Sequence, residues 1–139
     1  MTASPSAPTP PLVLVFAASD PSSGAGIQAD ILTLASLGCH PLTAITALTV
    51  QDTVGVQSVH PVSAELLEQQ ARVILEDMPV AAFKIGLIGS VENVLAIAEI
   101  VSDYPEIPLI FEPVLASGRG DELSSEEIFS AMRVMLLAQ

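Results

Sequence analysis

The sequence predicts an α/β fold with a mainly parallel sheet. Short apolar runs of strand length alternate along the chain with longer segments whose apolar residues recur at helical spacing. A Gly-rich turn, Asp20 to Gly26, joins the first such run to the first such helical segment. This alternation is typical of sheets in which each strand leads into a helix that carries the chain back for the next parallel strand.

The first strand is expected over Leu12–Ala18, a continuous apolar run typical of a buried central strand. The helix after the turn is expected over Ile27–Leu37, and Gly38 stops it. Gly24 and Gly26 let a ligand approach the backbone closely, and N–H groups at a helix N-terminus can hold a polar or anionic group. The apolar stripe of this helix comprises Ile27, Ile31, Leu34 and Ala35.

Further strands are expected over Thr43–Val50, Ala82–Ile88 and Leu109–Phe111, because these segments are rich in aliphatic and β-branched residues. Val54–Val59 is expected to form a short turn and strand that acts as a flap. Together with the first strand, the aliphatic segments predict the sheet.

Serines precede the three remaining helical segments, where a hydroxyl can accept a hydrogen bond from a helix N–H. The caps are Ser63, Ser90 and either Ser124 or Ser125. The inward faces of these helices are predicted from helical spacing. They are Leu67, Ala71, Ile74, Leu75 and Met78; then Val94, Ile97, Ala98 and Val101; then Ile128, Met132, Met135 and Leu136.

Composition narrows the functional classes. The 139 residues suit one domain over residues 12–139, preceded by a disordered Pro/Ser/Thr-rich tail over residues 1–11. The net charge of −12 disfavours nucleic acid and anionic membranes as partners. Cys39 is the one cysteine, so no internal disulfide and no cysteine-based metal site is expected. With neither a membrane-spanning run nor a signal peptide in the sequence, we expect a cytoplasmic protein.

Polar residues follow the predicted strands and should meet at one edge of the sheet, where α/β proteins bind ligands. They include Asp20, Gln51 and Glu112. Considered alone, Asp30 could be an exposed acid in the first turn of its helix. Lys84 could be either a buried-strand lysine that reaches this edge or a phosphate ligand, and both interpretations stay open.

Three stretches, residues 19–59, 83–90 and 111–123, resemble the hydroxymethylpyrimidine/phosphomethylpyrimidine kinases of thiamine biosynthesis, which are ribokinase-like. They include the runs SDPSSGAGIQAD, FKIGLIGS and FEPVLASGRGDEL. The resemblance implies the N-terminal half of a ribokinase-like domain. It also implies ATP-dependent phosphorylation of 4-amino-5-hydroxymethyl-2-methylpyrimidine, its monophosphate or both, with ATP and Mg²⁺, in a homodimer.

The resemblance also assigns roles to residues. Gln51 would hydrogen-bond the aminopyrimidine, since a primary amide offers both a donor and an acceptor. Asp30 would lie in the same pocket, and Glu112 and Lys84 would lie near the phosphates and the metal, with no metal site built from protein side chains alone. The other pyrimidine-binding positions implied are Ala18, Gly26, Leu87 and Val114.

Three positions depart from the family pattern: Ala18 and Ser23 replace glycines, and Glu112 replaces an aspartate. Family members are longer, and their C-terminal half carries a Gly-rich anion hole with a catalytic cysteine. No Gly-Thr-Gly-Cys-like segment occurs in this chain. No catalytic residue is therefore assigned here, and we expect the chain alone to be inactive. A non-catalytic pyrimidine-binding or interaction module and a pyridoxal-type kinase stay open as alternatives.

Overall fold

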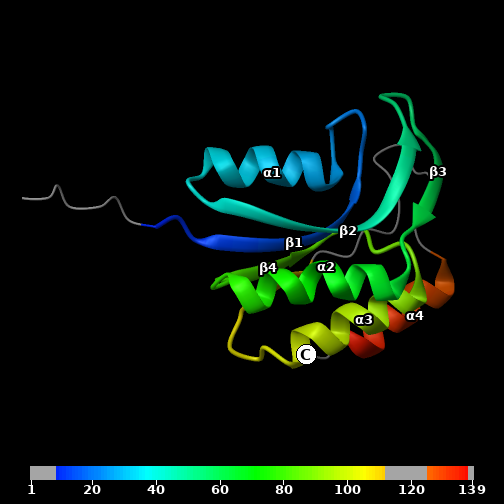
Figure 1. The fold of residues 1–139 in the computed structure, drawn as a ribbon. Helices are drawn as coiled ribbons and strands as arrows, with labels where there is room; N and C mark the ends of the chain where they lie inside the picture. The colour runs from blue at the N-terminus through cyan, green and yellow to red at the C-terminus, as the bar shows by residue number, and fades with distance from the viewer. Residues whose placement is uncertain (1–8, 112–124, 138–139) are drawn as a thin grey trace, which may run out of the picture.

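A computed structural model describes residues 9–111 and 125–137. Its sheet has five strands in the order β3-β2-β1-β4-β5, in which only β2 and β3 pair antiparallel. The predicted α/β fold with a mainly parallel sheet is confirmed (Figure 1). The strands are β1 (Leu12–Ser19), β2 (His40–Gln51), β3 (Val56–Pro61), β4 (Ala82–Ile85) and β5 (Leu109–Phe111). The helices are α1 (Gly26–Ser36), α2 (Ala64–Asp77), α3 (Val91–Ser102) and α4 (Glu126–Met135).

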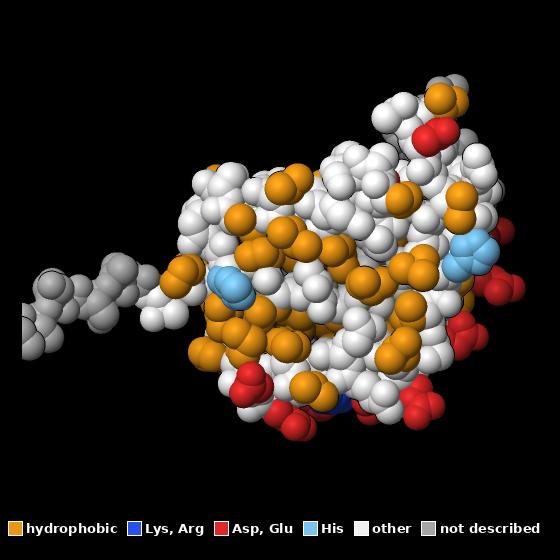
Figure 2. Space-filling view, turned by 45° about the horizontal axis from the view of Figure 1, so that its top comes forward, with side chains coloured by type: hydrophobic (Ala, Val, Ile, Leu, Met, Phe, Trp, Pro, Cys, Tyr) orange, Lys and Arg blue, Asp and Glu red, His pale blue; other side chains and the backbone are white. Residues whose placement is uncertain are grey.

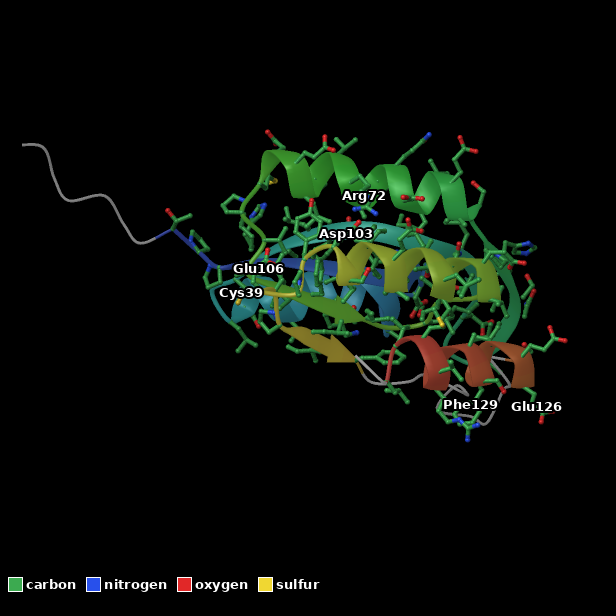
Figure 3. All side chains as sticks on the ribbon, turned by 90° about the horizontal axis from the view of Figure 1, so that it is seen from below. Cys39, Arg72, Asp103, Glu106, Glu126 and Phe129 are labelled. Carbon is green, nitrogen blue, oxygen red and sulfur yellow. The ribbon has the colours of Figure 1, made fainter. Side chains whose placement is uncertain are left out.

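One face of the sheet is covered by α2, α3 and α4, which lie side by side across it (Figures 1 and 3). The main core lies beneath them and includes Phe16 and Phe83, whose ring centroids are 5.9 Å apart. Ser63, Ser90 and Ser125 cap these helices, since each hydroxyl accepts a hydrogen bond from the N–H three residues later. The predicted caps are thus confirmed, with Ser125 rather than Ser124 at α4.

The opposite face is covered by α1 alone among the described helices (Figure 1). Its core is small: Val13, Val15 and Ala17 of β1 pack against Ile27. The predicted stripe of α1 is only partly correct, because Ile31 and Ala35 are exposed. Leu32 and Leu37 are also exposed, and so is Ile110 of β5, which neighbours Lys84 on this face. Figure 2 shows hydrophobic side chains gathered on the side of the molecule that includes α1.

Some strand boundaries and one inward-facing position differ from the predictions. The strand expected over Ala82–Ile88 ends at Ile85, because the chain then leaves the sheet as a loop, although Leu87 and Ile88 stay buried. The strand expected over Thr43–Val50 is longer and runs from His40 to Gln51. Met135 was expected to face inward and is exposed, since α4 ends there and Leu136 takes the buried position. The tail predicted over residues 1–11 lies mostly outside the described residues.

Arg72 of α2 joins the two neighbouring helices of the covered face (Figure 3). Its Nη1 lies 2.7 Å from Oδ2 of Asp103, the residue that directly follows α3, and its Nε lies 3.5 Å from Oε1 of Glu68. Partial burial is the largest influence on the pKa of Arg72 and lowers it, but Asp103 and Glu68 more than offset this and raise the pKa above its ordinary value. This interaction is structural and lies away from the predicted ligand site.

Candidate functional site

The Gly-rich turn between β1 and α1 is organised by the buried carboxylate of Asp20. Its Oδ1 accepts hydrogen bonds of 2.8 Å from the N–H and the hydroxyl of Ser22, and its Oδ2 accepts one of 2.8 Å from the N–H of Ala25. The N–H of Ser23 donates to the carbonyl of Asp20. Three backbone N–H groups that were expected to be available to a ligand therefore donate hydrogen bonds within the turn. These bonds make the turn rigid.

Gln28 fastens the first turn of α1 to the end of β1. Its Oε1 accepts from the N–H of Asp20, and its Nε2 donates to the hydroxyl of Ser19, both at 2.8 Å. Sequence reasoning missed this role. The available signal was a polar residue directly after Ile27, on the side of the helix that faces the strand it follows.

Gly26 lies against the backbone of β1, as the predicted close approach requires. Its φ is +66°, and a Cβ there would lie 2.5 Å from the carbonyl oxygen of Ala18. Ala18 in turn packs in a buried cluster with Ala47 and Leu87, against which Val59 of β3 also lies. The structure thus brings together three predicted site residues from three separate segments: Gly26, Ala18 and Leu87.

Gln51 is the last residue of β2 and lies at the same edge of the sheet. Thr49, two residues earlier, places its Oγ1 2.6 Å from Oε1 of Gln51 and 2.8 Å from the carbonyl oxygen of Ser19. The Gln51 amide, which was predicted to hydrogen-bond the pyrimidine, is therefore held next to the start of the Gly-rich turn. Sequence reasoning missed Thr49, although alternate residues of a strand share one face and the spacing gave that signal.

Asp30 and Lys84, which were predicted near different parts of the ligand, form an ion pair with each other. Nζ of Lys84 lies 3.0 Å and 3.1 Å from the two carboxylate oxygens of Asp30. A Cβ at Gly86 would lie 3.3 Å from the same Nζ and 3.1 Å from Cβ of Ala17. Because Gly86 precedes Leu87, the pair lies next to the loop that follows β4, on the α1 side of the sheet.

The loop after β4 is held to β2 by buried polar groups that the sequence did not single out. The hydroxyl of Thr46 donates to the carbonyl of Leu87 at 2.6 Å. The Nδ2 of Asn93 donates to the carbonyls of Thr46 and Val62, both at 3.1 Å. These bonds fix the position of Leu87 at the candidate site.

Two of the predicted site residues, Glu112 and Val114, lie outside the described residues. Among residues 9–111 and 125–137, no group of three or more His, Cys, Asp or Glu side chains could hold a metal ion. The two acids of this part of the site, Asp20 and Asp30, are already bound to partners within the chain. Both carboxylates are therefore engaged with partners inside the described part of the chain.

Comparisons with known proteins agree with the predicted family. The family model described as phosphomethylpyrimidine kinase matches residues 20–139. A hydroxymethylpyrimidine/phosphomethylpyrimidine kinase of Streptomyces coelicolor is 39% identical over 137 residues, which are 99% of this chain and 51% of the relative. A probable thiamine biosynthetic bifunctional enzyme of Oryza sativa is 40% identical over 128 residues, which are 92% of this chain and 23% of the relative.

Solved structures of kinases share the fold. A phosphomethylpyrimidine kinase from Clostridium difficile aligns with a TM-score of 0.84 at 36% identity, covering 91% of this chain and 55% of its own. A pyridoxal kinase from Staphylococcus aureus in complex with AMP-PCP aligns with a TM-score of 0.79 at 27% identity, covering 94% of this chain and 46% of its own. The chain thus spans about half the length of the Streptomyces coelicolor kinase and of these two solved structures.

Proposed function

The chain belongs to the phosphomethylpyrimidine kinase family, and we propose that it is the pyrimidine-binding part of a kinase of thiamine biosynthesis. The reaction is the transfer of a phosphoryl group from ATP to 4-amino-5-hydroxymethyl-2-methylpyrimidine, to its monophosphate, or to both. The observation that carries this proposal is the Gln51 amide, held by Thr49 at the ligand-binding edge of the sheet. Such an amide pairs with a heteroaromatic edge that carries both a donor and an acceptor.

The residues around Gln51 would bind and orient the ring. Gly26 lets the turn pack directly against the backbone of Ala18 because it has no side chain there, and Leu87 adds an apolar side chain next to Ala18. Asp20 and Gln28 hold the turn in place, so the site needs little rearrangement when a ligand arrives. Positioning is the main task of a protein in phosphoryl transfer, together with neutralising the charge of the phosphates.

The described residues contribute little to neutralising the negative charge of the phosphates. The sequence has 4 basic and 16 acidic residues, and the amine of Lys84 is already paired with Asp30. ATP is the proposed co-substrate, and Mg²⁺ would accompany its phosphates. The described side chains do not fit a Mg²⁺ site, so no step through the metal is assigned to them. We therefore propose that the chain alone binds the pyrimidine without turning it over.

Calorimetric titration of the chain with 4-amino-5-hydroxymethyl-2-methylpyrimidine tests binding, and ADP release in the presence of Mg-ATP tests turnover. We expect binding and no ADP release. Turnover at about 1 per second, an ordinary enzyme rate, would contradict the division of roles between this chain and the rest of a kinase. If no heat of binding is measured at any pyrimidine concentration, the proposed function is contradicted. A non-catalytic interaction module would then be the remaining interpretation.

The pyridoxal kinases among the similar structures make pyridoxal the second ligand to test. The same titration with pyridoxal discriminates between the two substrates. If the chain binds pyridoxal more tightly than the aminopyrimidine, we would instead infer that it is part of a pyridoxal-type kinase. The higher identity of the phosphomethylpyrimidine kinase structure, 36% against 27%, favours the pyrimidine.

We further propose that the protein is cytoplasmic and forms a homodimer through β3 and the adjoining end of β2. β3 is an edge strand, and Leu48, Val50 and Val54 next to it are exposed, which a second copy could cover. Sedimentation that gives one monomeric species at high concentration would contradict the dimer. No helix among the described residues is long and apolar enough to span a membrane.

A further inference from the structure

Three oxygen atoms at the end of β2 are linked by two short contacts that share the hydroxyl oxygen of Thr49. The carbonyl oxygen of Ser19 is 2.8 Å from Oγ1 of Thr49, and this Oγ1 is 2.6 Å from Oε1 of Gln51. Thr49 is buried, with 9% of its surface exposed, so solvent does little to relieve the contacts of its hydroxyl. Both distances are short enough to require a proton between the atoms.

The number of protons does not match the number of contacts. A threonine hydroxyl has one proton, and neither a backbone carbonyl nor an amide oxygen has one to donate. With Oε1 of Gln51 toward Thr49, one of the two contacts therefore joins lone pairs with no proton between them, which is unfavourable in a buried place.

Exchanging the oxygen and nitrogen of the Gln51 amide removes this conflict. The two atoms occupy equivalent positions in a primary amide, so the surrounding hydrogen bonds decide which one faces Thr49. With Nε2 there, Thr49 donates to Ser19 and accepts from Gln51. A separation of 2.6 Å is slightly short for an N–H donor, but a shift of about 0.2 Å restores an ordinary bond. With Oε1 there instead, the contact has no proton at any separation and so cannot become a hydrogen bond.

We propose that Thr49 is a positioning residue that holds the Gln51 amide with Nε2 toward Thr49 and Oε1 toward the ligand. The amide then presents its acceptor and its remaining donor in one fixed order. A ring with an exocyclic amino group matches an acceptor at that place, whereas a ring with an oxo group there places two acceptors face to face. Thr49 therefore sets the preference of the site for amino over oxo heterocycles. The ligand part of this inference rests on the proposed function, and the orientation of the amide does not.

The orientation is tested without any ligand by the NMR signals of the side-chain NH₂ groups in the ¹⁵N-labelled chain. Gln69 of α2 is exposed and lies outside the strands proposed for the dimer, so it serves as the internal control, and each signal is assigned by its loss in Gln51→Leu or Gln69→Leu. We expect the Nε2 protons of Gln51 to exchange with solvent several-fold more slowly than those of Gln69. Thr49→Val should abolish the difference, and Thr49→Ser should keep it. Equal exchange of Gln51 and Gln69 in the wild-type chain would overturn the orientation.

The specificity is tested by titrating the 4-amino ring and its 4-oxo analogue into each variant. We expect the wild-type chain and Thr49→Ser to prefer the amino ring about tenfold, the effect of one matched hydrogen bond. Thr49→Val should bring the ratio of the two affinities close to one. An equal weakening of both ligands with the ratio intact would show a merely structural role and overturn the proposal. If the wild-type chain binds neither ring, the proposed function fails, while the ligand-free NMR experiment still decides the orientation.

Discussion

The two faces of the sheet differ in how they are covered and in what they carry. Three helices bury one face over a core that includes both Phe16 and Phe83. The other face has α1 alone among the described helices, a small core, and the ion pair of Asp30 with Lys84. The Gly-rich turn and Gln51 lie where this second face meets the edge of the sheet. The first face therefore supplies most of the folding free energy, and the second keeps polar groups accessible for a ligand.

The sharpest test of this division compares one residue from each face. Phe83→Ala removes a fully buried ring from the covered face and should lower the free energy of unfolding by about 3–5 kcal/mol. Ile110→Ala shortens a side chain that is 59% exposed on the other face, and it should change the free energy of unfolding by only about 0.5 kcal/mol. Urea unfolding measures both. Equal losses would mean that the α1 face carries as much stability as the helix-covered face.

The next largest effect is expected in the turn. Gly26→Ala forces a side chain onto a backbone with a φ of +66° and places its Cβ 2.5 Å from the carbonyl oxygen of Ala18. Gly38→Ala is the matched control, because its φ is +83° and no atom lies within 4 Å of the added Cβ.

The control should lower the free energy of unfolding by about 1–2 kcal/mol, the general penalty of a left-handed alanine. Gly26→Ala should exceed this, because a clash with backbone is added, and should also weaken pyrimidine binding. If the two variants lose the same stability, the close approach of the turn to β1 is unimportant.

A smaller effect of opposite sign is expected at Ser23, which lies in the Gly-rich turn. Ser23 has a φ of +63°, a conformation that glycine adopts with less strain. Ser23→Gly should therefore raise the free energy of unfolding by about 0.5–1 kcal/mol. Ser22→Gly is the control and should lower it, because the hydroxyl of Ser22 donates to Asp20. Thermal unfolding of both variants decides, and a loss of stability in Ser23→Gly would argue against strain in the turn.

The covered face was the easier part to predict from the sequence. The apolar stripes of α2 and α3 reflect burial against the sheet, and Ser63 and Ser90 mark the helix starts through local hydrogen bonds. The stripe of α1 was less informative, because Leu32 and Leu37 are apolar and yet exposed. The apolar run to Ile88 suggested a longer strand, since burial and strand pairing give the same sequence pattern.

The contacts of the site were harder to predict, because they join residues that are far apart in the sequence. Thr49 meets Ser19 from 30 positions away, and Lys84 meets Asp30 from 54 positions away. The spacing of residues within one strand or helix carries no information about either contact, because each contact joins two different segments. The position of Gln51 at the end of a strand was predictable, and its spacing from Thr49 indicates a shared strand face, whereas the contact of Thr49 with Ser19 required the structure.

The central claim is that Gln51 at this edge of the sheet binds the pyrimidine, and titration of 4-amino-5-hydroxymethyl-2-methylpyrimidine into Gln51→Leu tests it most directly. Leucine has a similar size and no hydrogen-bonding groups, so the ring would lose its partners at a cost of about 1–3 kcal/mol. Binding should weaken about tenfold to a hundredfold relative to the wild-type chain. Gln69→Leu at an exposed position of α2 should leave affinity unchanged, provided that both variants unfold at the wild-type denaturant concentration. Undiminished binding by a folded Gln51→Leu chain would contradict the account.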